Sequence, residues 1–212
     1  MDQLLLDITP RPSPTLDNFV VGRNEELLSA LRNTLSGKGA ERCIYLWGDM
    51  GSGKSHLLSA CANASPDGIY AKASVPEPAN IVAVDDVDKL SDVEQIALFN
   101  LYNLMREQGG MLVTSGSMSP LHLKLRDDLR TRLGWGLVYQ VQTLSDEEKQ
   151  EALARHALNK GFLLAPEISH YLLRHGRRDM PSLLSTLDSL DEESRKLHRA
   201  PTIPLLKTIL NH

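Results

Sequence analysis

The segment that most constrains this chain runs from Gly48 to Ser55 and has the sequence Gly-Asp-Met-Gly-Ser-Gly-Lys-Ser. It fits the pattern G-x-x-x-x-G-K-[S/T] and lies between an apolar run and a helical pattern, which is the context that this pattern requires. Glycines let the backbone bend so that several N–H groups point at phosphate oxygens, and the following helix adds its positive end. The segment therefore predicts a phosphate-binding loop between a strand and a helix.

The residue types of this loop suggest individual roles toward a bound nucleotide. Lys54 can reach the terminal phosphates, and the Ser55 hydroxyl can hold Mg²⁺. The nucleotide-binding residues that we expect in and directly after the loop are Gly48, Gly51, Ser52, Gly53, Lys54, Ser55 and His56. The cofactors that follow are ADP or ATP with Mg²⁺. The alternative is a glycine-rich turn with an accidental lysine.

A second acidic element lies downstream, where the apolar run Ile81 to Val84 ends in Asp85 and Asp86. In P-loop proteins such a strand supplies an acid that holds Mg²⁺ and a residue that orients the attacking water. We assign the metal to Asp85, together with Ser55, and the catalytic role to Asp86. Two acids after a strand can also be no more than a polar loop, but the upstream phosphate loop favours the functional interpretation.

Strands and helices alternate along the first two thirds of the chain, which predicts an α/β fold with a parallel five-stranded sheet in three layers. We expect strands at 43–47, 69–73, 80–85, 111–114 and 137–142 and helices after Asn24, a possible N-cap, and after the phosphate loop. Two prolines leave no helix between the second and third strands. A long helix begins at a Ser91–Glu94 capping box. Its buried face should consist of Val93, Ile96, Ala97, Leu101, Leu104 and Met105.

From Ser145, where a second capping box involves Glu148, only helical patterns follow, near 145–160, 166–175, 180–197 and 202–210. This predicts a small C-terminal helical lid. We therefore divide the chain into an extended tail at 1–14, a nucleotide-binding α/β domain at 15–143 and the lid at 144–212.

Charge and hydropathy exclude several classes of protein. The chain has 23 Lys plus Arg against 27 Asp plus Glu, a net charge of −4, which argues against non-specific coating of nucleic acid. No apolar run approaches the about 18 residues of a membrane span, and the first twenty residues lead us to expect no secretory signal. We expect a cytoplasmic protein without membrane contact. Its two cysteines, Cys43 and Cys61, form no metal-ligand pattern and are predicted to be buried thiols.

Four passages together resemble the DnaA-related AAA+ family. They are Leu16 to Gly22, the phosphate loop, Val84 to Leu90 and Leu129 to Leu137, the last of which is similar to the family pattern L-x-S-R-F-G-W-G-L. The resemblance implies an AAA+ domain in which Val20 and Val21 line the adenine pocket. In this chain the lid is not followed by the helix-turn-helix domain of the initiators, which implies that DNA is reached only indirectly.

At the other end, Gln3, Leu4, Leu6 and Ile8 resemble the peptide with which bacterial proteins dock on the sliding clamp of DNA polymerase. An apolar strand that adds to the sheet edge is the alternative. Together with the AAA+ passages, this peptide resembles the regulators of the family that bind the clamp and inactivate DnaA. The resemblance implies a cytoplasmic partner of the clamp and of the DnaA initiator that acts in replication, and leaves homo-oligomerisation open.

In such regulators the arginine that corresponds to Arg132 is a finger that acts in trans on ATP held by the partner. The alternative is a surface arginine that pairs with Asp128 one turn earlier, and Arg130 is a weaker candidate for the finger. Two other functions stay open, a helicase-loading or clamp-loading ATPase and an adaptor that uses the nucleotide only as a structural ligand.

Two positions depart from the family pattern. Gly116 stands where relatives often have Asp, so that only the hydroxyls of Thr114 or Ser115 could act there, and Pro181 stands where the second sensor arginine is expected. Arg177 or Arg178 could replace that arginine, or the two could be a solvated pair. We therefore expect nucleotide binding with weak or no intrinsic ATPase and ADP as the natural resting ligand.

Overall fold

The computed structural model describes residues 13–210. Its larger part is built on a five-stranded sheet with the strand order β2-β3-β4-β1-β5, and every neighbouring pair is parallel. The strands are β1 (Cys43–Trp47), β2 (Ile69–Lys72), β3 (Ile81–Asp85), β4 (Met111–Gly116) and β5 (Leu137–Gln140). Because the strands are parallel, the loops that follow them gather at one edge of the sheet. The predicted α/β fold is confirmed.

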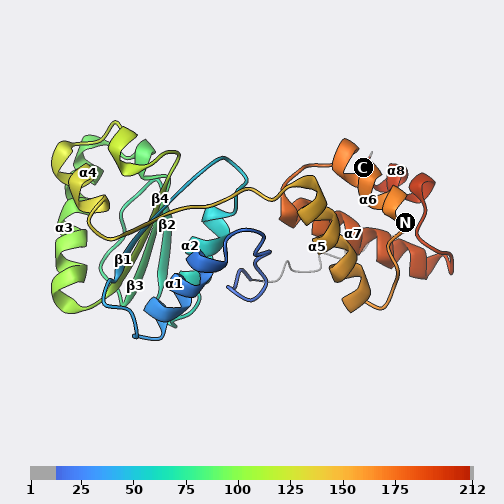
Figure 1. Cartoon of the computed structure of the whole chain (residues 1–212), viewed down its shortest axis with the longest axis horizontal. Coiled ribbons are helices and arrows are strands. Elements are labelled where there is room, and N and C mark those ends of the chain that lie inside the picture. The colour runs from blue at the N-terminus through green and yellow to red at the C-terminus, as the bar shows by residue number, and fades with distance from the viewer. Residues whose placement is uncertain (1–12, 211–212) are drawn as a thin grey trace, which may run out of the picture.

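Helices cover both faces of this sheet (Figure 1). They are α1 (Glu25–Leu35), α2 (Lys54–Ala62), α3 (Asp92–Gln108) and α4 (Asp127–Leu133), with short 3₁₀ turns at η1 (Val87–Lys89) and η2 (Pro120–His122). The first two pack on one face of the sheet, and α3 and α4 pack on the other. Strand β1 serves both cores, because Ile44 and Leu46 point into one and Cys43 and Tyr45 into the other.

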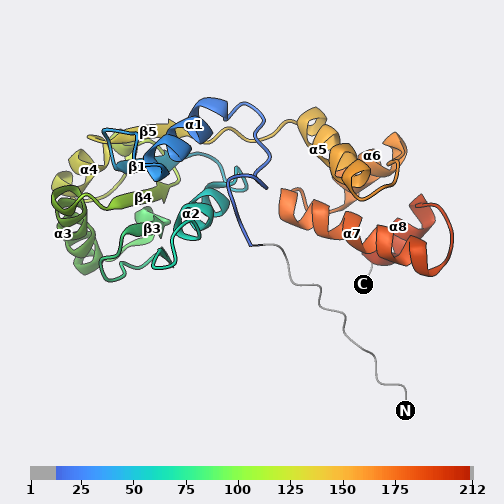
Figure 2. The same ribbon diagram turned by 90° about the horizontal axis from the view of Figure 1, so that it is seen from below.

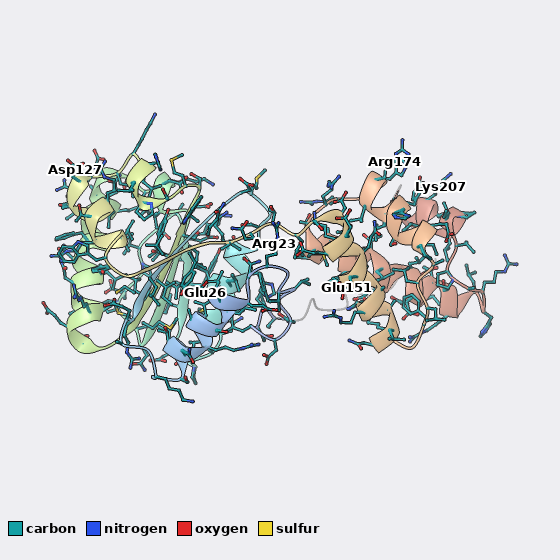
Figure 3. All side chains as sticks on the ribbon, viewed as in Figure 1. Arg23, Glu26, Asp127, Glu151, Arg174 and Lys207 are labelled. Atoms are coloured by element: carbon teal, nitrogen blue, oxygen red, sulfur yellow. The ribbon has the colours of Figure 1, made fainter. Side chains whose placement is uncertain are left out.

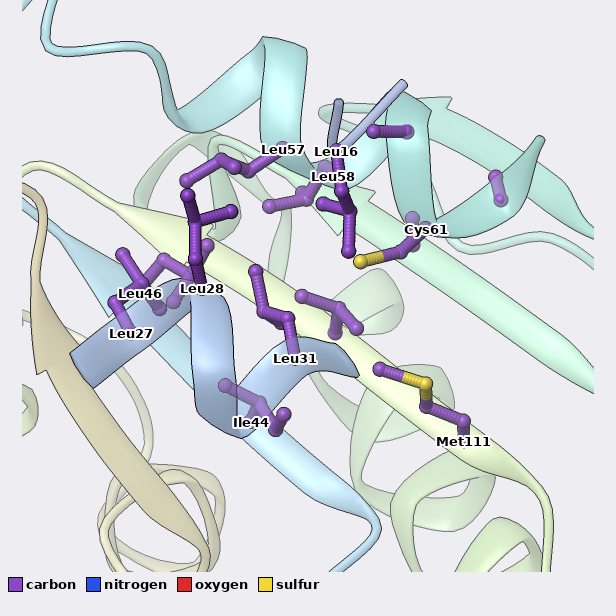
Figure 4. Close-up of a cluster of buried hydrophobic side chains, with 14 of the residues drawn as sticks. Leu16, Leu27, Leu28, Leu31, Ile44, Leu46, Leu57, Leu58, Cys61 and Met111 are labelled. Atoms are coloured by element: carbon purple, nitrogen blue, oxygen red, sulfur yellow. The ribbon is translucent and has the colours of Figure 1, made fainter. Parts of the chain in front are cut away.

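The core under α1 and α2 extends to the segment that precedes α1. Figure 4 shows Leu28 and Leu31 of α1 facing Leu57 and Leu58 of α2 across the sheet face. Leu16 is buried among them, although it lies outside any helix or strand. The segment that contains Leu16 is thereby anchored to α2, which begins at the phosphate loop.

The lid after β5 consists of α5 (Asp146–Asn159), α6 (Pro166–His175), α7 (Met180–Lys196) and α8 (Ile203–Leu210). Leucines from all four helices form a separate core, among them Leu153, Leu172, Leu187 and Leu206. Figure 2 shows the lid beside the α/β part, joined to it by the segment that follows β5. Arg23 lies at this junction (Figure 3), where its guanidinium donates to the Thr143 carbonyl at 3.1 Å.

Both predicted capping boxes, Ser91–Glu94 and Ser145–Glu148, are confirmed. Asn24 directly precedes α1 but its side chain does not cap the helix. The Asn24 amide instead accepts a hydrogen bond from the Gln142 N–H at 2.8 Å and donates to the Gln142 carbonyl at 3.0 Å. The residue therefore ties the start of α1 to the segment that follows β5.

The predicted buried face of α3 is partly wrong. Leu101 and Met105 are buried as expected and Leu104 is half-buried, whereas Val93, Ile96 and Ala97 are exposed. The residues that α3 buries besides these two are Gln95, Leu98 and Tyr102. Gln95 is satisfied there, because its amide donates to the Leu90 carbonyl at 3.1 Å and accepts from the Arg126 N–H at 2.9 Å. A polar residue with two backbone partners thus takes a place that apolar periodicity assigned to neighbouring positions.

Other expectations are confirmed. Residues 73–80, between β2 and β3, contain no helix. Both cysteines are buried and free, and burial raises the pKa of Cys43 to about 11 and that of Cys61 to about 12, so that both thiols stay protonated. Among residues 13–210, no helix combines the length and the apolar character needed to cross a membrane.

Candidate functional site

The phosphate loop connects β1 to α2 in a conformation that requires glycine. Gly48, Gly51 and Gly53 have φ angles of 145°, 83° and 103°, which side chains rarely allow. A Cβ at Gly48 would lie 2.6 Å from the Val141 carbonyl oxygen, and one at Gly53 would lie 2.6 Å from the Phe19 ring. The loop is therefore enclosed by the residue that directly follows β5 on one side and by the segment before α1 on the other.

Lys54 turns back over this loop. Its Nζ donates to the carbonyls of Gly48 at 2.7 Å and Asp49 at 2.8 Å. Burial lowers the pKa of the Lys54 amine, and the nearby carboxylates of Asp85 and Asp86 oppose that shift. The two carbonyls are neutral acceptors, so a phosphate oxygen would be a stronger partner for the same ammonium group.

Asp85, at the end of β3, is fully buried and surrounded by hydroxyl groups. Its Oδ2 accepts from Ser55 Oγ at 2.5 Å and from Tyr70 Oη at 2.9 Å. Its Oδ1 accepts from the Ser115 hydroxyl and from the Asp86 N–H at 3.1 Å. The carboxylate is thus held by three side chains from three different elements, of which sequence reasoning had paired only Ser55 with it.

Ser55 and Asp85 also fit the requirements of Mg²⁺, which binds proteins through hard oxygen donors and completes its shell with water and phosphate. The 2.5 Å contact between their oxygens brings the two predicted metal residues together beside the phosphate loop. When bound there, Mg²⁺ would neutralise charge on the phosphate oxygens.

Asp86 has a left-handed backbone conformation, with φ of 57° and ψ of 49°. Its Oδ2 lies 2.8 Å from Lys89 Nζ and 3.6 Å from Lys72 Nζ. Burial by itself would raise the pKa of Asp86, but the hydrogen bond and charge of Lys89, aided by Lys72, lower it overall. A carboxylate whose charge is already held by two lysines is a poor base for an attacking water.

Three other predicted nucleotide residues lie on or near the segment before α1. Val20 and Val21 are half-buried there. His56 Nε2 is 2.9 Å from the Thr15 carbonyl, and its ring is tilted against Phe19 at 5.6 Å between centroids. His56 therefore fastens that segment to α2, a role that sequence reasoning did not foresee.

At the end of β4, Gly116 stands where relatives often have Asp, and the side chain of Tyr45 lies against it. A Cβ at Gly116 would collide with the hydroxyl of Tyr45, which donates to the Met118 carbonyl at 2.7 Å. Of the two candidate hydroxyls on this strand, that of Ser115 contacts Asp85, whereas Thr114 Oγ1 donates to the Ile44 carbonyl at 3.4 Å. Tyr45 thus fills the space that an aspartate at position 116 would require.

Arg132 lies on the opposite layer, in the last turn of α4. Its guanidinium carbon is 4.0 Å from the ring centroid of Trp135 and 5.5 Å from that of Phe99. Asp128, the expected alternative partner, is bound instead by Arg126 at 3.0 Å, and Arg130 pairs with Asp127 at 2.8 Å. Within residues 13–210, Arg132 forms no ion pair. Its guanidinium is stacked on aromatic rings and is not neutralised by a carboxylate there. We call Phe99, Arg132 and Trp135 the arginine face.

In the lid, Pro181 lies in the first turn of α7, where proline is tolerated. Asp179 caps this helix by accepting from the Ser182 N–H at 3.0 Å. Arg178 pairs with Asp146 at the start of α5, and Arg177 lies 3.5 Å from Asp179. Both arginines are therefore engaged inside the lid, although the start of α7 is the end of that helix nearer the α/β part (Figure 2). The predicted clamp-binding residues Gln3, Leu4, Leu6 and Ile8 lie outside the described residues.

Solved structures with the same fold include two from DnaA. Domain III of the Thermotoga maritima replication initiation protein DnaA has a TM-score of 0.73 at 18% identity and covers 96% of this chain and 98% of its own. AMPPCP-bound DnaA from Aquifex aeolicus has a TM-score of 0.70 at 21% identity, covering 88% and 70%. The Thermotoga maritima RuvB branch migration motor has a TM-score of 0.64 at 16% identity, covering 95% and 72%.

The sheet order, the phosphate loop and the helical lid define an α/β protein of the AAA+ class. The family model described as "Hda, lid domain" matches residues 146–210. A Haemophilus influenzae protein described as uncharacterized is 36% identical over 228 residues, covering 99% of this chain and 98% of its own. The chain belongs to the DnaA-related AAA+ family and is close to Hda.

Proposed function

We propose that this chain is a regulator of replication initiation that uses Arg132 to promote hydrolysis of ATP bound to a DnaA-type initiator. The observation that carries the proposal is the arginine face, where a cation is stacked 4.0 Å from the Trp135 ring centroid and pairs with no acid in the described structure. A guanidinium inserted beside a γ-phosphate stabilises the charge that develops during transfer and raises rates by about 10³ to 10⁵ in other nucleotide hydrolases.

Location favours action in trans. The backbone at Gly136, shortly after Arg132, lies against the carbonyl of Cys43 at the start of β1, whereas the phosphate loop begins after the end of β1. A five-residue strand separates these ends by about 16 Å. Arg132 also belongs to the α3–α4 layer, and α2 lies on the other face of the sheet. A nucleotide on a partner is therefore a more accessible target than the chain's own.

The chain's own site would hold ADP or ATP as a structural ligand with little hydrolysis. The loop glycines, Lys54 and Ser55 supply phosphate and metal contacts, whereas Asp86 is bound by two lysines and is poorly suited to activate water. An activator needs a stable shape more than its own turnover. A helicase-loading or clamp-loading motor would instead need an active site of its own, and strong DNA-stimulated hydrolysis by the purified chain would favour that class.

The clamp-binding part of the proposal rests on the sequence of Gln3, Leu4, Leu6 and Ile8. Glutamine can bond to a polar rim while the apolar side chains enter a pocket, as in other peptide-recognition modes. Gln3→Ala with Leu6→Ala should abolish binding to the sliding clamp in a pull-down. Retained binding would assign the contact to another part of the chain.

The experiment that tests the finger measures hydrolysis of radiolabelled ATP preloaded on the DnaA initiator, with DNA-loaded clamp and an excess of this chain. Arg132→Ala should reduce the stimulated rate by at least about tenfold. Arg130→Ala is the matched control, because it removes an arginine two positions away that is already paired with Asp127. Equal stimulation by wild type and Arg132→Ala would refute the assignment and leave a nucleotide-bound adaptor as the remaining reading.

A further inference from the structure

The edge strand β2 directs two side chains to Asp85, the last residue of β3, and to Asp86, which follows it. Tyr70 and Lys72 are two residues apart, so they point to the same side of the strand. Tyr70 Oη reaches Asp85 and Lys72 Nζ reaches Asp86. The register Lys72↔Asp85 shows that the tips of the two strands lie side by side at the phosphate-loop edge. Side chains of β2 therefore contact both acids, the one expected to hold Mg²⁺ and the one expected to orient the attacking water.

Tyr70 shares one oxygen of Asp85 with the serine of the phosphate loop. Oδ2 accepts from Ser55 Oγ at 2.5 Å and from Tyr70 Oη at 2.9 Å, while Oδ1 is occupied by Ser115 and the Asp86 N–H. Because Asp85 is fully buried, each of these donors replaces water that the carboxylate has lost. Both oxygens are therefore satisfied by the protein alone.

The tyrosine can act as the donor, because an ordinary phenol has a pKa of about 10 and keeps its proton at neutral pH. Tyr70 is 37% exposed and lies on an edge strand, so its hydroxyl can leave Asp85 without opening the core.

We propose that Tyr70 is a positioning residue whose hydroxyl takes the place of a magnesium-bound water at Asp85, so that this chain binds nucleoside diphosphate almost independently of Mg²⁺. The inference rests on the proposed nucleotide binding and concerns the chain's own site. Mg²⁺ dehydrates reluctantly and usually reaches a buried carboxylate through its own waters. For such a water to donate to Oδ2, the Tyr70 hydroxyl must leave, and one donor is exchanged for another with little net gain.

Without the phenol hydroxyl, the same oxygen would retain only Ser55 as a donor. A magnesium-bound water could then fill the vacancy without displacing anything. Removal of this one oxygen atom should thus make the affinity for nucleoside diphosphate depend on Mg²⁺, whereas in the wild-type chain it does not. A tyrosine that merely supports the edge strand would not change the dependence on the cation when replaced by phenylalanine.

The test is the dissociation constant of ADP measured by isothermal titration calorimetry on the nucleotide-free full chain, in Mg²⁺ and in EDTA. For wild type we expect the two constants to agree within about threefold. For Tyr70→Phe we expect ADP to bind at least about tenfold more tightly in Mg²⁺ than in EDTA. Tyr139→Phe is the matched control, because it removes the same atom from β5, and it should behave as wild type.

Each result decides the inference. A wild-type chain that binds ADP about tenfold more tightly with Mg²⁺ would overturn it, and this arm needs no variant to fold. Equal cation dependence in wild type and Tyr70→Phe would also overturn it, while leaving nucleotide binding intact. Absence of ADP binding in all arms would refute the nucleotide proposal together with this inference. None of these measurements involves Arg132 or the initiator, so they do not test the role of Arg132 as an arginine finger.

Discussion

The nucleotide site and the arginine face differ in whether the chain itself neutralises their charged side chains. At the nucleotide site the chain itself matches the two acids at the end of β3, since Asp85 accepts from three hydroxyl groups and Asp86 lies between two lysines. On the arginine face Arg132 is positioned by aromatic rings and pairs with no acid in residues 13–210. The first arrangement favours a stable, resting site, and the second keeps a cation available for a group supplied from outside.

The largest expected effect is on stability, where a substitution in the nucleotide site should cost more free energy of unfolding than one on the arginine face. Asp85→Asn keeps the shape of a buried side chain but cannot accept from all of its hydroxyl neighbours, so we expect it to lower the free energy of unfolding by about 2–3 kcal/mol. Arg132→Ala removes only a partly exposed stacking contact and should cost less than about 1 kcal/mol. Urea denaturation followed by circular dichroism measures both. Similar losses in the two variants would contradict the contrast.

An intermediate effect on stability is expected at Gly116, the position where relatives often have Asp. Gly116→Asp would force the Tyr45 hydroxyl from its position, which should cost about 1–3 kcal/mol of stability. Adding Tyr45→Phe removes the colliding oxygen and should restore part of the loss, a coupling that thermal denaturation of the single and double variants can measure. Purely additive effects would show that the two residues do not share that space.

The smallest expected effect concerns pH. Because its lysine partners lower the pKa of Asp86 in the folded chain, its ionised form contributes stability above pH about 4, and this is lost as the pH falls through the lowered pKa. Replacing both Lys72 and Lys89 by Met should remove this contribution, which is small because solvent screens such exposed lysines. The loss should appear at pH 6 and vanish near pH 2 in urea titrations. A loss that does not depend on pH would point to packing instead.

Local patterns predicted much of the fold. The apolar run that becomes β1, the two capping boxes and the phosphate loop are all short-range features, and each lies where expected. The buried face of α3 was misjudged because Gln95 is buried through hydrogen bonds to Leu90 and Arg126, which apolar periodicity cannot reveal.

The site was predicted less completely, because its unforeseen members come from other strands. Tyr70 and Lys72 lie on β2, and only the sheet order places that strand beside β3. Tyr45 controls position 116 because β1 pairs with β4. The signal available in the sequence was the two-residue spacing of Tyr70 and Lys72, which becomes meaningful once the neighbouring strand is known.

The most direct test of the contrast compares Arg132→Ala with Asp86→Asn in one assay, the single-turnover hydrolysis of ATP bound to the DnaA initiator in the presence of DNA-loaded clamp. If the chain's own acids serve only its resting site, Asp86→Asn should keep the stimulated rate within about twofold, whereas Arg132→Ala should lower it by at least about tenfold. A large loss with Asp86→Asn and full activity with Arg132→Ala would contradict the account.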